Sequence, residues 1–476
     1  MKTHIFLAIL VIVALFSAET FAQYPEDILR IAEPGIGVGA RAVGLGLEYA
    51  GVANDYSAIY WNPAGLGQLK MNEFSFGLSQ LSFSNDGSYY GNSQSFSNSS
   101  TNLNTLGLVY SVPTERGSLV IAFGYDRQSD FTTGLSFDGF NPSSSIIQSW
   151  APDGRQYPSD LSGNAAYQLY LANIDTLTGL WDSKIKDSLR QTGTVIEGGG
   201  INHYSFAAAV EASPHLYLGL TLSIVSGSYT YDRQYAETDS KNVHNTFPFD
   251  LTSLTLLEHV NSDITGFGAK LGLLYDFSDN SRIGLTIATP TWVTVKETFT
   301  QNATSLFDNN QSYNFGGEGS DEYDASTPFV FTLAGSYGIR YLMLTGAIEY
   351  TDWTQMEFRN ADPSLLDYNT TIKEDFHATT NLHVGAEYEI VPGEVQIRAG
   401  YAYLPSPYAA DAFSSGFAKK YITGGLSFSV ANAVIVELGY AHGMWKDYVQ
   451  NYSDPTSTVS EDVKTNTFLG TISYRF

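Results

Sequence analysis

The sequence contains no cysteine, which excludes a disulfide framework and a lipid anchor on an amino-terminal cysteine. It is also poor in charge, because Asp, Glu, Lys and Arg make up 15% of its 476 residues, against about 25% in typical soluble domains. Basic residues are the scarcer kind, and the formal charge of −25 argues against a nucleic acid partner. Beyond the amino terminus, no apolar run reaches the roughly 18 residues that a membrane helix needs.

Enzyme motifs are missing as well. The sequence has neither a GxSxG elbow nor an HExxH pair, and its eight histidines are scattered. We therefore expect no catalytic residue, no bound metal and no cofactor. The acidic run of Glu318, Asp321, Glu322 and Asp324 could hold a divalent cation between lipopolysaccharide phosphates, but it lacks a defined ligand spacing. A solvated loop explains this run more simply.

The amino terminus has the pattern of a secretory signal. Lys2 precedes an apolar run from Ile5 to Phe16, and the segment that ends at Ala22 suits cleavage. The apolar run is too short to span a membrane. We expect residues 1–22 to be removed and the mature chain to be exported.

What the chain has in quantity is aromatic residues and two-residue alternation, with 32 Tyr and 28 Phe. Between residues 265 and 277, large apolar side chains such as Phe267 and Leu271 occupy every second position, and glycine or polar residues such as Lys270 lie between them. A strand with one apolar and one polar face suits a wall between lipid and a wet lumen. The pattern predicts an all-β fold, a transmembrane antiparallel β-barrel of the outer membrane of a Gram-negative bacterium.

We predict about fourteen strands joined by alternating short and long connections, as in bacterial outer-membrane barrels. An even number places both termini on the short-turn side, in the periplasm. The last strand ends at Phe476, with aromatic or apolar residues at alternating positions before it, and resembles the signal read by the outer-membrane assembly machinery. Outer-membrane lipids and lipopolysaccharide are the other expected partners. The predicted strands are 73–84, 102–112, 117–137, 201–213, 216–232, 258–277, 281–300, 325–339, 341–358, 376–391, 393–404, 418–430, 433–446 and 463–476.

Residues 35–69 do not fit the barrel pattern, because they are rich in Gly and Ala and lack alternation. Pro63 takes Asn62 out of helical geometry and favours a turn there. Small residues allow close backbone approach, and a fourteen-stranded barrel encloses a lumen that would leak if it were empty. We therefore predict that residues 23–72 form a plug inside a barrel of residues 73–476. An ordinary surface loop is the alternative.

The plug segment also resembles the hatch of a known family. The matching residues are Gly39-Ala40-Arg41-Ala42, Gly44-Leu45-Gly46, Ala50-Gly51-Val52-Ala53 and Asn62-Pro63-Ala64-Gly65-Leu66, with a later match at Gly199-Gly200-Ile201-Asn202. These resemble the FadL-like (TodX-type) outer-membrane transporters of long-chain fatty acids and hydrocarbons. The resemblance implies a plugged barrel that passes hydrophobic small molecules inward without an energy source. A barrel that serves protein secretion or surface attachment and a polar-solute porin remain alternatives.

The longest predicted loop, residues 138–200, carries a candidate ligand-binding stripe. Tyr170, Ile174, Leu177 and Trp181 recur at helical spacing, which predicts an amphipathic helix. Its apolar face either packs on the barrel rim or forms a landing groove for an apolar ligand. The family resemblance implies a helical loop at this place, which favours the groove.

The third predicted strand contains a polar interruption, the candidate lateral gate, formed by Asp126, Arg127, Gln128, Ser129 and Asp130. Alternation turns Arg127 and Ser129 outward, and an Arg facing lipid at mid-membrane costs about 2–4 kcal/mol. Either these residues lie above the bilayer or the strand kinks, and the resemblance implies a kink that opens the wall sideways. Pro290 is a second expected interruption of strand pairing. The lumen-facing Lys270, Glu349, Arg398 and Glu437 are expected to pair with one another or with the plug.

Overall fold

The structure, a computed structural model, describes residues 25–476 apart from 153, 176, 412–413 and 432. The predicted signal segment therefore lies outside the described residues. The strands are β1 Glu73–Tyr89, β2 Asn92–Val112, β3 Leu119–Asp130, β4 Thr133–Asn141, β5 Asn173–Ile174, β6 Trp181–Asp182, β7 Leu189–Ser213, β8 Leu216–Thr238, β9 Leu251–Ser278, β10 Ser281–Ala288, β11 Trp292–Phe307, β12 Ser312–Ser326, β13 Val330–Ile339, β14 Leu342–Asp352, β15 Glu357–Arg359, β16 Ala378–Val391, β17 Val395–Leu404, β18 Lys419–Val430, β19 Val434–Gln450 and β20 Thr458–Arg475.

Helical elements are few and short. Among the described residues, no helix combines the length and the apolar character needed to cross a membrane. The α-helices are α1 Pro25–Ala32, α2 Ala40–Gly44, α3 Ala58–Trp61, α4 Ile146–Ser149, α5 Ala165–Gln168 and α6 Pro363–Asp375, and the 3-10 turns are η1 Pro63–Gln68, η2 Pro158–Leu161, η3 Trp353–Gln355, η4 Ala409–Asp411 and η5 Pro455–Ser457.

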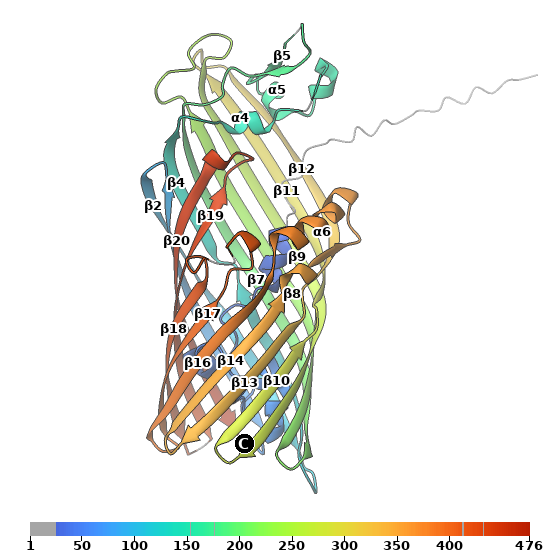
Figure 1. The fold of residues 1–476 in the computed structure, drawn as a ribbon, viewed down its shortest axis with the longest axis vertical. Helices are drawn as coiled ribbons and strands as arrows, with labels where there is room; N and C mark the ends of the chain where they lie inside the picture. Colours follow the sequence, from blue (N-terminus) through green and yellow to red (C-terminus); the bar gives the residue numbers. More distant parts are fainter. Residues whose placement is uncertain (1–24, 153, 176, 412–413, 432) are drawn as a thin grey trace, which may run out of the picture.

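The predicted fourteen-stranded antiparallel barrel is confirmed (Figure 1). Neighbours along the chain pair with each other, and β1 also pairs with β20, which closes the ring. Backbone bonds between Asn72 and Phe476, at 3.1 and 3.0 Å, complete the closure. Some barrel strands are interrupted, so that β3 continues as β4, β10 as β11, and β13 is the continuation of β12. A closed ring pairs the backbone groups that an open sheet edge would expose to lipid.

The alternation predicted from the sequence is visible in the exposure of the side chains. Phe267 and Leu271 on β9 and Leu222 on β8 are all exposed on the outer surface. Residues of the opposite parity, such as Thr221 and Leu274, are buried against the lumen contents. An apolar outer face around a closed ring is what a lipid environment requires.

Several predicted long loops are instead strands. β1 and β2 meet at a tight turn at Tyr90 and Gly91, within the predicted loop 85–101. β11 and β12 pair through most of the predicted loop 301–324, and α6 fills most of the predicted loop 359–375. In Figure 1, β11 and β12 rise past the level of α6. The sequence hides these extensions because Ser, Thr and Asn occupy both faces, so the apolar alternation that marks a lipid-facing strand is absent.

The chain before β1 runs through the lumen. α1 lies at mid-height beside α6 (Figure 1), and the following segment descends to the short-turn end. Its backbone touches the wall so closely that a Cβ at Gly385 would lie 2.4 Å from the carbonyl oxygen of Leu45. A Cβ at Gly400 would lie 2.2 Å from the nitrogen of Gly46. Glycines on both surfaces thus allow this contact. The C-terminus, Phe476, lies at the short-turn end (Figure 1), whereas the first described residue, Pro25, is buried at the start of α1.

Candidate functional site

The hatch motif is a turn anchored to both the plug and the wall. The side chain of Asn62 accepts a hydrogen bond from the backbone of Ala64 at 3.1 Å, which caps η1. Its amide donates to the carbonyl of Ala50 at 2.9 Å and to that of Leu273, on β9, at 3.1 Å. Pro63 starts η1, and all five motif residues, Asn62, Pro63, Ala64, Gly65 and Leu66, are buried. The motif therefore fixes how the plug sits against the wall.

The lower part of the lumen is lined by paired charges. Arg41 of α2 donates two hydrogen bonds to Glu387 on β16, at 2.9 and 2.8 Å. Arg398 on β17 contacts Glu387 as well and pairs with Glu437 on β19 at 3.1 Å, as expected from the sequence. These four residues, together with Arg475, line a chamber of about 250 Å³ at the short-turn end. The direct way out of the barrel at this end is thus strongly polar.

A buried carboxylate lies in the middle of the plug. Glu48 is buried between the plug and β14, where Thr345 donates a hydrogen bond to its carboxylate at 3.4 Å. Burial raises the pKa of Glu48 to about 7.

The candidate lateral gate coincides with a break in the wall. The β2–β3 ladder ends at the pair Thr105–Asp126, and the β3–β7 register shifts between Arg127 and Ser129. β3 then ends, and β4 pairs with β7 alone. The partner strand bends at the same point, because Gly199 and Gly200 have φ values of 102° and 154°. Only glycine adopts such a backbone readily, so β7 follows the bulge of β3 while it keeps its register with β8.

The gate residues make specific contacts around this break. Asp126 is buried and accepts hydrogen bonds from Thr105 at 2.9 Å and from the plug residue Tyr56 at 3.3 Å. The ring of Tyr56 fills a slot left by Gly107 and Gly124, where any Cβ would overlap it. The plug is therefore in direct contact with the strand at the last residue before the bulge.

Arg127 keeps the outward parity of Phe123, as expected, whereas the expectation that Ser129 faces lipid is wrong, because the register shift lies between the two residues. Arg127 folds back onto β7 and donates to the carbonyl of Gly199 at 2.7 Å, and Ser129 is buried. The carbonyl of Gln128 faces Gly35 of the plug segment. The carboxylate of Asp130 accepts hydrogen bonds from the β2 side chains Ser100 and Asn102, both at 2.6 Å. The register shift after Arg127 is the local irregularity that the kink alternative requires, and the position of these residues relative to the bilayer stays a prediction.

The predicted amphipathic helix of the outer loop is also wrong. Ile174 and Trp181 belong to β5 and β6, which pair as a small hairpin. Leu177 lies in the turn of that hairpin and is 90% exposed, while Tyr170 packs against Tyr313 of β12 with ring centroids 4.2 Å apart. Trp181 packs against the apolar cluster under the loop. The spacing of four, three and four residues between these side chains matches a helix in sequence, but the four residues are distributed over the two strands of the hairpin, its turn and the segment before it, so they do not share one face.

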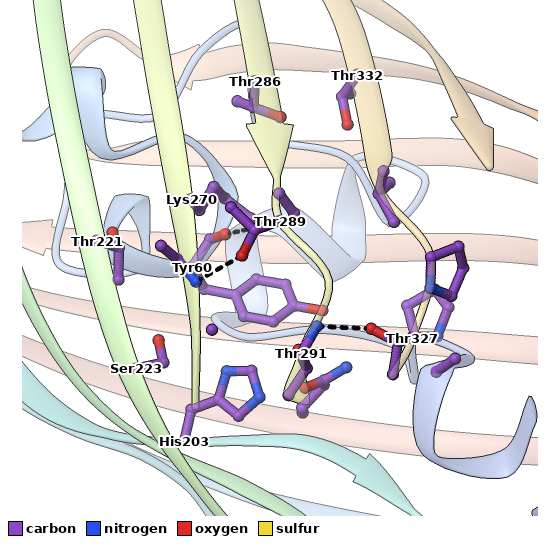
Figure 2. Close-up of a pocket in the computed structure, with 18 of the residues that line it drawn as sticks. Tyr60, His203, Thr221, Ser223, Lys270, Thr286, Thr289, Thr291, Thr327 and Thr332 are labelled. Carbon is purple, nitrogen blue, oxygen red and sulfur yellow. Dashed lines mark hydrogen bonds between the residues drawn. The ribbon is translucent and has the colours of Figure 1, made fainter. Parts of the chain in front are cut away.

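A cavity that the sequence did not predict lies between the plug and strands β7–β14. Its volume is about 130 Å³. Figure 2 shows Tyr60 of the plug, His203 of β7 and Lys270 of β9 around it, with threonines from the interrupted strands. Lys270 donates to the carbonyl of Tyr60 at 2.6 Å, as expected of a lumen residue that pairs with the plug. The strand break at Pro290 is as predicted, and across it the backbone of Thr291 donates to Thr327 at 2.8 Å. The sequence signal for this cavity is limited to the alternation of β9, which predicts that Lys270 faces the lumen.

The acidic run of Glu318, Asp321, Glu322 and Asp324 belongs to strand β12, so its interpretation as a solvated loop is wrong. In the part of the chain that the structure describes, no three His, Asp or Glu side chains are grouped as metal ligands. Glu322 pairs with Lys296 at 3.2 Å, and Asp324 accepts a hydrogen bond from Thr294 at 2.7 Å. These side chains point along β12 toward neighbouring strands and not toward one centre.

Comparisons with solved structures agree with this fold. The chain is similar to the P. putida toluene transporter TodX, with 14% identity, a TM-score of 0.56 and coverage of 92% of this chain and 99% of that one. It is similar to a Pseudomonas aeruginosa FadL homologue, with 12% identity, a TM-score of 0.56 and coverage of 94% and 99%. It is also similar to the Ralstonia pickettii toluene transporter TbuX, with 15% identity, a TM-score of 0.51 and coverage of 92% and 98%.

Sequence comparison identifies the family. No curated protein matches the chain significantly in sequence. The family model of the outer membrane protein transport protein (OMPP1/FadL/TodX) matches residues 201–476, which is more than half of the chain. The plug and the gate strands lie before this match, and their likeness rests on the fold. The chain belongs to the OMPP1/FadL/TodX family of outer membrane transport proteins.

Proposed function

We propose that the protein carries hydrophobic small molecules, such as long-chain fatty acids or hydrocarbons, across the outer membrane by passive diffusion past the plug, with release sideways through the wall. The observation that carries this proposal is the break between β2 and β3 at Asp126, which lies beside a plugged lumen. The barrel would be oriented with both ends of the ring, Asn72 and Phe476, in the periplasm.

Polarity within the lumen supports a sideways route. A ligand moving straight toward the short-turn end would meet the charged chamber of Arg41, Glu387, Arg398 and Glu437. Passage of an apolar molecule there would require it to displace bound water and paired charges without gaining contacts. In this proposal, the break beside Arg127–Ser129 instead gives an apolar ligand its way from the lumen to the lipid-facing surface. Tyr56 connects the plug to this point, so plug movement and wall opening can be coupled.

The substrate class follows from the family and not from any one relative. The similar solved structures include toluene transporters and a FadL homologue. At 12–15% identity they support the fold alone. Monoaromatic hydrocarbons and fatty acids therefore both belong to the proposed range.

Uptake by a deletion strain tests the proposal against its alternatives. Cells that lack the protein should take up less labelled fatty acid or toluene than cells with the gene restored, with unchanged release of surface proteins. Reduced protein release with unchanged uptake would favour the secretion or attachment role. Steady ion conductance of the purified intact protein in planar bilayers would favour a polar-solute porin.

The outer hairpin is proposed as a first contact for apolar ligand. Replacing the exposed Leu177 with Ser should lower uptake at low ligand concentration by less than about tenfold, because a ligand would bury only part of a side chain whose full burial is worth about 1.5–3 kcal/mol. Val243, exposed in the loop between β8 and β9, provides a matched Val243→Ser control. Trp181→Ser should instead loosen the loop, since this ring packs on the apolar cluster. Equal uptake by the Leu177 variant and the intact protein would remove the hairpin from the route.

A further inference from the structure

The cavity beside Tyr60 contains two polar groups that the fold leaves without full partners. The buried Nε2 atom of His203 makes no hydrogen bond. The ammonium group of Lys270 donates one hydrogen bond, to the carbonyl of Tyr60, and makes no ion pair among the described residues. An ammonium group has three N–H donors, and a buried polar group without a partner is costly to maintain. Both groups face the same space (Figure 2), which suggests that a ligand completes them.

The size of the cavity limits what that ligand can be. Its volume of about 130 Å³ is close to the roughly 150 Å³ of an engineered protein cavity that binds benzene. One aromatic ring therefore fills it, and a long acyl chain exceeds it. A single ring is therefore the part of a ligand that this cavity can hold.

The residues that line the cavity indicate the chemical class of the ligand. Ile31, Ile59 and Trp353 supply apolar surface, and nine serine and threonine side chains supply hydroxyl groups. One cation, Lys270, and one anion, Glu349, leave the site without net charge. A ligand that is partly apolar, able to hydrogen-bond and uncharged matches this lining. A pure hydrocarbon would leave His203 unpaired.

We propose that this cavity binds a neutral single-ring aromatic molecule that carries a hydroxyl group, which is the chemistry of a phenol. The ligand hydroxyl donates to Nε2 of His203. The ring lies beside Tyr60 and Lys270, whose ammonium group is already 4.8 Å from the centre of the Tyr60 ring and is attracted to a second aromatic face in the same way. The inference rests on the proposed passage of small hydrophobic molecules and narrows their class at this site.

Binding of p-cresol and toluene to the protein in lipid nanodiscs tests the proposal, because the two differ by one hydroxyl group. After correction with empty nanodiscs, p-cresol should bind at least about tenfold more tightly than toluene, as expected for a hydrogen bond in a buried site. His203→Leu should remove this preference and leave toluene binding unchanged, whereas Lys270→Met should weaken both. His259, exposed on the distal part of β9, gives the matched control His259→Leu, which should behave as the intact protein.

The outcomes separate this inference from the proposed function. Equal affinities for p-cresol and toluene, or a His203→Leu variant that keeps the preference, would overturn the phenol site and leave hydrophobic transport untouched. Failure of the deletion strain to show any uptake defect, combined with selective p-cresol binding, would overturn the transport role and leave the site standing. Altered electrophoretic mobility on heating reports whether each variant barrel is folded, so a misfolded variant is recognised before binding is measured.

Discussion

Deletion of residues 35–66 should convert the protein into an open pore with steady ion conductance in planar bilayers, whereas the intact protein should conduct little. The wall does not depend on the plug for its hydrogen bonds, since each strand pairs with its neighbours and β1 pairs with β20. The barrel should therefore assemble without the plug. Fourteen strands enclose a lumen too wide for wall side chains alone to fill, and in this barrel many inward positions are glycine.

A milder variant links the conductance to plug anchoring. Arg41→Met removes the two hydrogen bonds from α2 to Glu387, worth roughly 1.5–3 kcal/mol each for bonds to a charged group. Glu387 keeps its contact with Arg398, so the wall remains paired. We expect brief openings in this variant, between the closed intact protein and the open deletion. A folded deletion variant that conducts no more than the intact protein would show that the segment is not a plug.

The barrel was predictable because a strand between lipid and a polar lumen carries apolar residues at every second position. Lys270 and Phe267 illustrate it, since one faces the lumen and the other faces outward as expected. The parts of β1 and β2 around Tyr90 were missed for the same reason. Where both faces of a strand carry polar residues, the sequence shows no apolar alternation. A long hairpin of such strands then cannot be told from a loop by its sequence.

The site was only partly predictable, because its contacts are long-range. The sequence identified Asn62-Pro63 as a turn and Arg127–Ser129 as an interruption, which are local properties. It could not place Tyr56 in the slot between Gly107 and Gly124, nor bring His203 beside Lys270, because these contacts depend on how the plug sits in the closed ring. The helix predicted around Trp181 was wrong for the opposite reason. The sequence there has a regular apolar spacing, but the residues that produce it belong to a hairpin.

Joining β2 to the start of the wall break should abolish most uptake of hydrophobic ligand. Ser100 on β2 and Asp130 at the end of β3 are in contact, with 2.6 Å between Oγ and Oδ2. The double variant Ser100→Cys with Asp130→Cys places two thiols across the gap in a chain that has no other cysteine. A disulfide or a short thiol crosslink would then hold β2 against β3 beyond Asp126, where the backbone ladder ends.

The expected size of this effect follows from the solubility of the ligand. Each methylene buried from water is worth about 0.8 kcal/mol, so a chain of ten loses roughly 8 kcal/mol on entering an aqueous exit. A ligand that moves from an apolar site directly into the bilayer avoids this cost. If the wall is held shut, the remaining path leads through the charged chamber of Arg41 and Glu387, and uptake should fall to near the level of the deletion strain.

Reversibility and a matched bridge make the test decisive. Reduction of the crosslink should restore uptake in the same cells. The control pair Ser82→Cys with Ser99→Cys joins β1 to β2 at directly paired positions away from the break, and this bridge should leave uptake unchanged because that ladder is already continuous. If the Ser100–Asp130 bridge leaves uptake the same when formed and when reduced, ligand does not leave through this part of the wall. The bulge at Arg127–Ser129 would then serve only to redirect β3 around the plug.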